Sequence, residues 1–570
     1  MKELFRKKAV LNTFLFLLTF GFLRFLIRWT AVRIQYDIGR KTGVEISLVA
    51  SSVMILLKLA SDRSKRREYN GIEYGSSRWG SKKDLAPYMD PDISKNMIFS
   101  KTEFLSMDQH RTQRDCHAFV IGGTGSGKSR FYALPNIMQM NASYVVTDPN
   151  GSHLKNEGKM LEEHGYQVKV FDVEHMERSL HFNPFHYYRE PEDIIRFVDL
   201  FIANTNGGVK QSGSEDMGFW RNCEKLWFMA HIAYIQETCM EEEKNMNSLV
   251  LLLDNSATKE EDEDYKSPVD ILFDELEKQN PDSFAVKQYK KYKLAAGKTA
   301  KSILISVGVR LANFDIPKVA NLFSDDELEL EKLGDEKTAL FLIISDTEQT
   351  YNFIAAILLD VLFNILSKAA DDSPGQHLKI PVRCILDEIA NIGYFPDLHN
   401  MIAVLRKRWI SLELLFQNIG QLKALYKDHW ETIASNCSTT LFLGGNGEET
   451  TKHVSQGLLG KATIDTVSYG SGGTSGSMGK SSYNSNEQKT GRYLLDETEL
   501  AQLDGSECIT CIRGLPPFKG KKYDPRTHPN YKFLADSDPR NTYSFHRGTD
   551  LSHADIRYIT LDLNKGKINY

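Results

Sequence analysis

The chain has 570 residues, of which 41% are hydrophobic and 25% charged, and its net charge is −5. This composition excludes large-scale disorder, and the length allows about three or four domains at roughly 150 residues each. A negative net charge excludes a wholly basic nucleic-acid coat protein but is compatible with a local basic channel. The seven cysteines have no framework spacing, which favours a reducing compartment. Cys508 and Cys511 lie in a strand-like run, where we expect a structural strand rather than a metal or redox site.

The N-terminal region contains two apolar runs. Residues 9–27 are almost wholly apolar, residues 44–60 form a second run, and each is near the ~20 residues that a bilayer-spanning helix needs. Basic clusters at 2–8 and 63–67 flank the pair, which predicts that both ends lie in the cytoplasm. No small-residue cleavage site follows the first run, which disfavours a cleaved signal peptide. We therefore expect a two-span anchor over residues 1–66 and a multi-pass protein of the cell membrane.

Strand and helix patterns alternate after this region. Residues 117–121, 143–148 and 167–172 have the pattern of buried strands, and their spacing indicates a parallel α/β sheet. Residues 190–335 show helical periodicity instead, which predicts an all-α insertion. The sheet pattern then resumes, with a helix at 351–369 and strands at 339–345, 381–388, 411–416 and 439–443.

A glycine-rich loop follows the first of these strands and opens a predicted helix. It matches G-x-x-x-x-G-K-[ST], the phosphate-binding loop (P-loop) of ATPases. We predict that its backbone N–H groups cradle the phosphates of ATP, that Lys128 reaches the terminal phosphates, and that Ser129 binds Mg²⁺. Arg130 is expected in a structural or adenine-side role. The predicted nucleotide-binding residues are Gly122, Gly123, Thr124, Gly125, Ser126, Gly127, Lys128, Ser129 and Arg130.

Two carboxylates stand at the end of the predicted strand 381–388. Asp387 is predicted to hold Mg²⁺, directly or through water, and Glu388 to polarise the attacking water. Acidic residues at strand ends are common, but their pairing with the P-loop in one parallel sheet indicates hydrolysis of ATP. We therefore predict an ATP hydrolase with ATP and Mg²⁺ as cofactors.

Three further polar residues follow predicted strands or lie in a basic run. Arg406 could stabilise charge on the transferred phosphate, often from a neighbouring subunit, or its basic run could contact DNA, and spacing does not decide between the two. Gln417 ends the strand 411–416, where it could sense the γ-phosphate or have no such role. Asp148 is expected to cap a turn rather than to support the nucleotide.

Residues 468–486 are rich in glycine and serine, which predicts a mobile loop. Within it, Lys480, Tyr469 and Tyr483 offer one charge and two stacking faces for single-stranded DNA. A surface insertion without a function is equally compatible with this composition.

Taken together, these motifs resemble the TraG-type coupling proteins of type IV secretion, especially their Gram-positive branch. The resemblance covers residues 70–530, and its most specific part is LDEIANIG followed by Gln-x-x-x-Gln-Leu. Where this family usually has lysine after Asp-Pro, the chain has Asn150. The matching segments, in chain order, are GSSRWG (75–80), GGTGSGKS (122–129), DPNG (148–151), FNPF (182–185), FW (219–220), LDEIANIG (386–393) and QNIGQL (417–422).

The resemblance implies a homo-hexamer at the inner face of the membrane, with its ATPase domain in the cytoplasm. Such a machine hands a relaxase bound to single-stranded DNA to the proteins of a type IV secretion channel. The resemblance also implies that the helical insertion contacts the substrate and that Arg406 acts on a neighbouring subunit's nucleotide.

The expected fold class is α/β, a RecA-like P-loop ATPase core with an all-α insertion and an N-terminal two-span membrane anchor. The expected domains are the anchor at 1–66, the two parts of the ATPase domain at 67–189 and 336–530, the insertion at 190–335 and a polar C-terminal tail at 531–570.

The sequence does not identify the transported cargo. A coupling ATPase for conjugative DNA transfer is the favoured function. A machine that exports only effector proteins, or a docking receptor whose ATPase drives assembly, would carry the same motifs. A motor on duplex DNA is disfavoured because it would not explain the insertion with Phe219 and Trp220.

Overall fold

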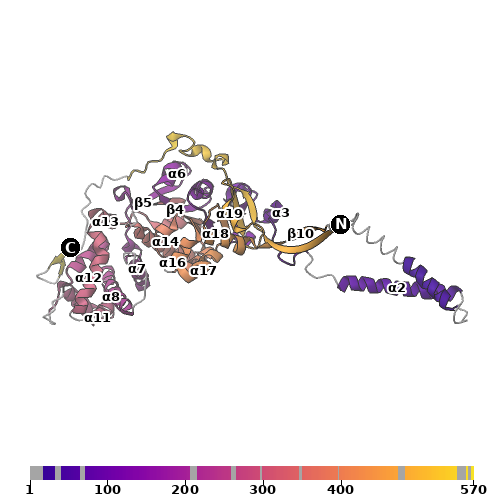
Figure 1. Ribbon diagram of the computed structural model, residues 1–570. Helices are drawn as coiled ribbons and strands as arrows, with labels where there is room; N and C mark the ends of the chain where they lie inside the picture. The colour runs from indigo at the N-terminus through magenta and orange to yellow at the C-terminus, as the bar shows by residue number, and fades with distance from the viewer. Residues whose placement is uncertain are drawn as a thin grey trace. The chain divides into compact units, whose positions relative to one another are not determined.

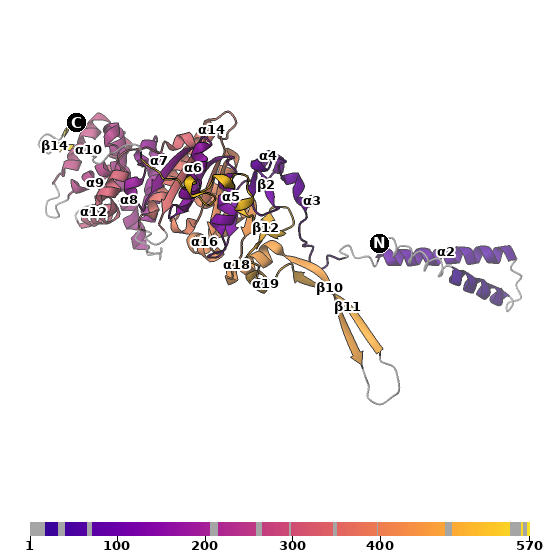
Figure 2. The ribbon, with the colours of Figure 1, turned by 90° about the horizontal axis from the view of Figure 1, so that it is seen from above.

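The computed structural model forms two compact units (Figures 1 and 2). The first comprises residues 1–76 and 461–492, and the second comprises 77–460 and 493–570. The acidic run at 259–264 and the tip of the glycine-serine segment lie outside the described residues. The described residues are 17–31, 40–64, 71–205, 215–257, 265–295, 298–345, 350–395, 397–472, 482–547, 560–562 and 567–569.

The second unit is built on a nine-stranded sheet with the order β13-β12-β9-β3-β8-β7-β4-β6-β5. The strands from β9 to β5 are parallel, and β12 and β13 extend the sheet in antiparallel fashion. The predicted α/β fold is therefore confirmed, and Cys508 and Cys511 lie in a strand as expected. The bounds are β3 Ala118–Ile121, β4 Ser143–Pro149, β5 Gln167–Asp172, β6 Thr338–Ile344, β7 Val382–Leu386, β8 Ile410–Phe416, β9 Thr439–Phe442, β12 Glu507–Ile512 and β13 Phe518–Lys521.

Helices cover both faces of this sheet, which is why its parallel strands are continuous apolar runs. Successive residues of a strand point to opposite faces. Ala118 and Val120 of β3 pack with α5 (Leu134–Met138) and α6 (Ser152–Glu163). Phe119 and Ile121 belong instead to the larger core, which contains α14 (Asn352–Asp372) and α16 (Ile419–Tyr426).

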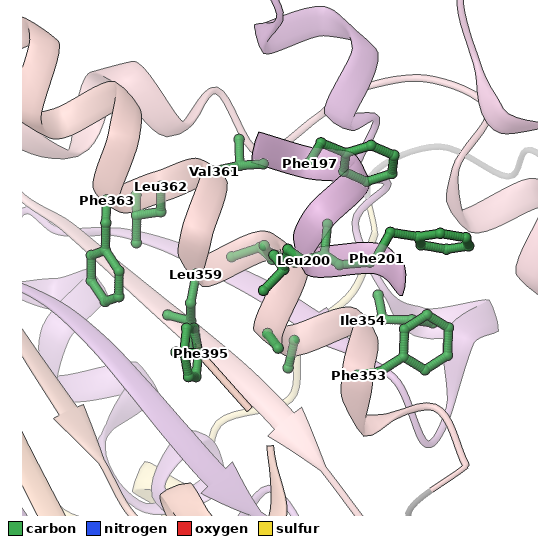
Figure 3. Packing of buried hydrophobic residues seen from close by; sticks show 14 of the residues in the cluster. Phe197, Leu200, Phe201, Phe353, Ile354, Leu359, Val361, Leu362, Phe363 and Phe395 are labelled. Atoms are coloured by element: carbon green, nitrogen blue, oxygen red, sulfur yellow. The ribbon is translucent and has the colours of Figure 1, made fainter. Parts of the chain in front are cut away.

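Between β5 and β6 the described residues form helices and no strand (Figure 1). The first of them, α7, packs on α14 of the sheet region: Figure 3 shows Phe197, Leu200 and Phe201 beside Phe353 and Ile354. This shared apolar core ties the helical region to the sheet. The helices of the region are α7 Pro191–Asn204, α8 Glu215–Thr238, α9 Met246–Asp254, α10 Pro268–Gln279, α11 Phe284–Tyr292, α12 Lys298–Leu311 and α13 Pro317–Leu322.

The chain after β13 forms a strap across one face of the core, which we call the C-terminal strap (residues 525–547). Asn530 donates to the carbonyl of Met138 at 2.8 Å, and the N–H of Tyr543 donates to the carbonyl of Lys155 in α6 at 3.0 Å. Leu534 is fully buried, and Arg547 forms an ion pair with Glu327 at 2.9 Å, shortly before β6. The sequence predicts only a polar C-terminal tail here, without secondary structure. In the structure, most of the described part of this tail is packed against the core.

The first unit contains a long β-hairpin, β10 (Lys461–Gly472) and β11 (Ser482–Tyr493). Much of the segment 468–486, for which the sequence predicts a mobile loop, is therefore strand. The side chains of Tyr469, Lys480 and Tyr483 lie outside the described residues. The base of the hairpin is joined to the segment that follows α2, because the N–H of Thr463 donates to the carbonyl of Gly75 at 3.1 Å.

The N-terminal part of the first unit is helical over 17–31 and in α2 (Arg40–Ser64). Among the described residues, the one helix that is long and apolar enough to cross a membrane is α14, and 72% of its apolar window is buried in the core. It is a core helix of the second unit. The predicted two-span anchor is thus not confirmed, since α2 carries charged residues at both ends and residues 9–16 of the first run lie outside the described part.

Candidate nucleotide site

The sequence motifs meet at the carboxyl edge of the parallel sheet. The P-loop follows β3, Gln417 follows β8, Asp387 and Glu388 follow β7, and Asp148 stands at the end of β4. These strands are neighbours in the order β3-β8-β7-β4. Ligands of open parallel sheets bind at the carboxyl ends of the strands, so this edge is the candidate nucleotide site.

The P-loop is held by the ends of β8 and β9, the two strands that flank β3. Gly122 donates its N–H to the carbonyl of Phe416 at 3.1 Å, and Gly123 donates to the carbonyl of Gly444 at 2.9 Å. Gly125 and Gly127 have φ values of +76° and +81°, a left-handed backbone that glycine adopts without strain. The motif therefore needs these two glycines for its backbone path.

Lys128 is 8% exposed and donates from Nζ to the carbonyl of Gly122 at 3.2 Å, so its ammonium lies over the loop. Arg130 is exposed, and its charge contributes to the lowered pKa of Asp524, although Arg526 is the main cause. Arg130 therefore points to the side of the P-loop where the chain passes after β13. The structure brings Lys128 into the site and leaves Arg130 at its rim.

The two predicted magnesium ligands touch each other. The Ser129 hydroxyl donates a hydrogen bond to Asp387, although these residues are 258 positions apart. Asp387 is 2% exposed, and its own carbonyl accepts a hydrogen bond from the Thr147 hydroxyl at 2.7 Å. A hydroxyl and a carboxylate are the oxygen donors that Mg²⁺ prefers. This donor pair therefore fits the metal that the sequence predicts.

Glu388 and Gln417 form a second contact at the same edge. Gln417 donates from Nε2 to one carboxylate oxygen of Glu388 at 3.3 Å, and Asn391 donates to the other at 3.1 Å. Glu388 has a φ of +52°, which is uncommon for a residue with a side chain and is a form of strain concentrated at functional sites. The two amides fix the direction of this carboxylate.

Asp148, which the sequence predicts to cap a turn, accepts the N–H groups of His153 at 3.0 Å and Leu154 at 2.7 Å, in the first turn of α6. Within α6, the His153 ring contacts Glu157 at 3.0 Å, and both side chains are buried. Burial alone would lower the pKa of His153, but Glu157, Asp148 and Asp387 together raise it to about 10. The end of β4 thus contributes a buried charged cluster that sequence analysis did not foresee.

Lys522, which follows β13, also lies at this site, although the sequence gave no reason to select it. Its Nζ donates to the carbonyl of Ser126 in the P-loop at 2.9 Å, across 396 positions of the chain. Burial lowers the pKa of Lys522. The only local signal is the basic run at 519–522, which resembles any solvated strand end.

Arg406 lies away from this edge. It belongs to a short helical turn, Arg406–Arg408, that precedes β8, whereas Gln417 follows the same strand. A strand of seven residues is about 23 Å long, so Arg406 and Gln417 stand at opposite edges of the sheet. The structure therefore does not bring Arg406 to the nucleotide site of its own chain.

The rest of the basic run is partly used within the fold. Arg408 forms an ion pair with Asp371 at 2.5 Å, and the Trp409 ring stacks on His377 with 3.6 Å between centroids. Lys407 is exposed. Of the residues that the sequence offers for DNA contact here, Arg406 and Lys407 keep their charges outside such ion pairs in the described part of the chain.

Comparison with known proteins gives one family and a set of relatives. A family model described as type IV secretory system conjugative DNA transfer matches residues 82–524. The conjugal transfer protein TraG of Rhizobium radiobacter is 22% identical over 413 residues, which cover 71% of this chain and 61% of that protein. The type IV secretion system-coupling protein VirD4 of Bartonella quintana is 26% identical over 203 residues, or 35% of this chain and 30% of that protein. The chain thus spans about three fifths of the TraG relatives.

Solved structures of the bacterial conjugative coupling protein TrwB have a similar fold. The unbound form of TrwBdeltaN70 gives a TM-score of 0.56 at 17% identity and covers 80% of this chain and 97% of that one. TrwB in complex with the ATP analogue ADPNP gives 0.55 at 16% identity, covering 80% and 97%. TrwB in complex with ADP and Mg²⁺ gives 0.55 at 16%, covering 81% and 95%.

Proposed function

Because the chain belongs to the type IV secretory system conjugative DNA transfer family, we propose that it is a coupling ATPase that powers conjugative DNA transfer. The observation that carries the proposal is the contact between Ser129 of the P-loop and Asp387 at the end of β7. This contact unites the phosphate loop and the predicted metal ligand in one site. The contact of Gln417 with Glu388 adds an oriented carboxylate for water activation.

ATP and Mg²⁺ are the proposed ligands, supported by the oxygen donors of this site and by the ADP and Mg²⁺ bound in the related TrwB structure. The P-loop N–H groups and Lys128 bind the phosphates, and Ser129 and Asp387 would hold Mg²⁺. A bound Mg²⁺ would supply positive charge that stabilises the negative charge developing on the phosphates. Glu388 polarises the attacking water, and Gln417 keeps the Glu388 carboxylate in place.

Two substitutions test this assignment. Lys128→Ala removes the charge at the terminal phosphates, and we expect it to abolish ATP hydrolysis and DNA transfer. Glu388→Gln keeps the shape and removes the base, so nucleotide binding should persist while turnover falls by at least about 100-fold. Binding of a fluorescent nucleotide and release of inorganic phosphate measure the two steps separately. Normal hydrolysis by either variant would contradict the proposed site.

We further propose that the N-terminal helices anchor the chain in a membrane, with the ATPase domain in the cytoplasm. The support is that large apolar side chains of these helices are exposed while small polar side chains are buried, the reverse of the pattern in a water-soluble helix. Phe25 and Val49 are 67% and 63% exposed, whereas Ser47 and Ser51 of α2 are fully buried. Membrane helices pack through small residues and turn large apolar ones to the lipid. A truncated chain that lacks residues 1–64 should leave the membrane fraction.

The proposed cargo is a relaxase bound to single-stranded DNA, delivered to type IV secretion channel proteins by a homo-hexamer. The support is the family description and the conjugal transfer names of the relatives. Single-stranded DNA should stimulate hydrolysis, and the stimulation should fall steeply between about 50 and 200 mM salt because phosphate contacts release counterions. Stimulation by protein cargo alone would instead favour export of effector proteins.

A further inference from the structure

The strongest observation that the proposed mechanism does not use is the position of Lys522. This residue follows the antiparallel edge strand β13, yet its Nζ reaches the carbonyl of Ser126 in the P-loop at 2.9 Å. The ammonium also lies 5.3 Å from the centre of the Phe131 ring. Lys522 is only 8% exposed, and its backbone is fixed by a hydrogen bond from its N–H to the carbonyl of Ser506 at 2.8 Å. The sheet therefore fixes the position of the Lys522 backbone and places its side chain against the P-loop.

This ammonium is buried without a carboxylate beside it. Asp504 and Cys508 are the groups whose charges favour its protonated form, and neither forms an ion pair with it among the described residues. A buried cation is costly unless an anion or several acceptors compensate it. An ammonium has three N–H donors, and the Ser126 carbonyl uses one. A phosphate chain bound in the adjacent loop would supply the compensating negative charge.

The contact also determines the direction of one peptide group of the loop. Ser126 lies between Gly125 and Gly127, whose φ values are +76° and +81°, so side-chain sterics restrict the backbone little here. In a planar trans peptide the C=O and the following N–H point in opposite directions. By holding the Ser126 carbonyl on its own side, Lys522 turns the N–H of Gly127 to the opposite side, away from its own ammonium.

We propose that Lys522 is a positioning residue of the nucleotide site, which orients the Ser126–Gly127 peptide for binding a nucleoside diphosphate group and adds a second buried positive charge beside it. The inference rests on the proposed function and extends it to a segment outside the P-loop motif. Because the diphosphate is common to ADP and ATP, the effect is on binding of both. Hydrolysis at the γ-phosphate is affected less.

Lys522→Met, which keeps the length and removes the charge, tests the proposal in the full-length chain. We expect the Kd for ADP with Mg²⁺ to rise at least about tenfold, as for loss of a charged hydrogen bond. KM for ATP should rise in parallel while kcat stays within about threefold, because the lost interaction is uniform binding. Lys522→Arg retains charge and donors and should recover most of the affinity. Lys519→Met is the matched control, since Lys519 lies in β13 and pairs with Glu507 at 2.9 Å at the surface.

Melting temperatures measured without nucleotide distinguish a loss of positioning in the site from a general loss of packing. The proposal is overturned if Lys522→Met binds ADP as the unchanged chain does, or if Met and Arg variants lose affinity equally and melt equally early. If the Met variant does not fold, Lys522→Gln takes its place in the same comparison. Lys128→Ala serves as the reference: normal nucleotide binding by that variant rejects the site itself. Loss of binding with Lys128→Ala but not with Lys522→Met rejects only the role of Lys522.

Discussion

At the scale of single residues, the proposed site contains one carboxylate, that of Glu388, whose direction is fixed by two side-chain amides. Glu388 receives hydrogen bonds on both carboxylate oxygens, from Asn391 and from Gln417. A catalytic group that is held in this way is already close to its working geometry, which lowers the cost of reaching the transition state. The backbone strain at Glu388 is consistent with the same purpose, because a left-handed residue at a strand end aims its side chain away from the ordinary strand direction.

Gln417→Ala should therefore lower kcat by roughly ten- to hundred-fold, the range for loss of a partner that orients a catalytic group. Nucleotide affinity should change little, because Gln417 contacts Glu388 rather than the P-loop side chains. Phosphate release under saturating ATP measures the first effect, and titration with a fluorescent analogue measures the second. Gln456→Ala is the control, since Gln456 makes an exposed bond of the same kind to Glu497 at 2.9 Å. Equal kcat values for the two variants would refute an orienting role.

At the scale of elements, a buried ion pair joins the strands that carry the proposed catalytic residues. Arg383 of β7 and Glu413 of β8 are fully buried and 2.7 Å apart. Tyr132, near the start of the helix after the P-loop, donates to Glu413 at 2.7 Å, and Arg383 donates to Asn136 of α5 at 2.9 Å. One polar network thus connects two strands with the helix that the P-loop opens.

Removing one partner of this pair should be far more harmful than removing both. Glu413→Gln leaves the Arg383 charge buried without a counter-ion, and we expect a loss of about 3–5 kcal/mol in the free energy of unfolding. The double variant with Arg383→Met and Glu413→Leu should be much closer to the unchanged chain. Urea-induced unfolding measures both. Lys290→Ala, which breaks the exposed pair with Glu277 at 2.5 Å, should cost less than about 1 kcal/mol. A similar loss for all three variants would contradict this account.

At the scale of the whole molecule, the position of Arg406 bears on assembly. Its own chain's nucleotide site lies at the opposite edge of the sheet, so a catalytic role for Arg406 requires a neighbouring subunit. A hexamer of RecA-like subunits is the proposed arrangement, and in such a ring each site would combine one chain's P-loop with the next chain's arginine.

This arrangement predicts complementation. Arg406→Ala and Lys128→Ala chains should each be inactive, and mixing them should restore part of the ATPase activity, because some interfaces then join an intact P-loop to an intact arginine. The expected recovery is about a quarter of the sites if subunits assort at random, since half of the P-loops and half of the arginines are intact. Phosphate release by mixtures of verified composition measures it. No recovery in such mixtures would assign Arg406 a structural or DNA-binding role.

The parts of this molecule that sequence predicts share one property, which is that their signal is local. The P-loop, Asp387 and Glu388 stand at ends of apolar strands, so periodicity and motif locate them together. Lys522 and the C-terminal strap were missed because their partners lie hundreds of residues away and their own segments are polar and aperiodic. The hairpin was missed because its composition is misleading. Glycine and serine in residues 468–486 indicate a loop, but pairing of the flanking segments with each other extends the strands into it.

The C-terminal strap has a consequence for the way in which the protein is made. A ribosome releases the N-terminal helices, the P-loop and the two proposed catalytic carboxylates long before residues 522–547, so a nascent chain exposes α6 and the Ser126 carbonyl until translation is nearly complete. The nucleotide site is therefore finished last, after the segments proposed to anchor the chain have emerged. A chain that stops prematurely after β9 would have every recognised motif and still lack Lys522, the strap and the edge strands. Such a fragment should reach its destination in the cell and bind nucleotide poorly, so that synthesis of residues 522–547 acts as the last condition for nucleotide binding.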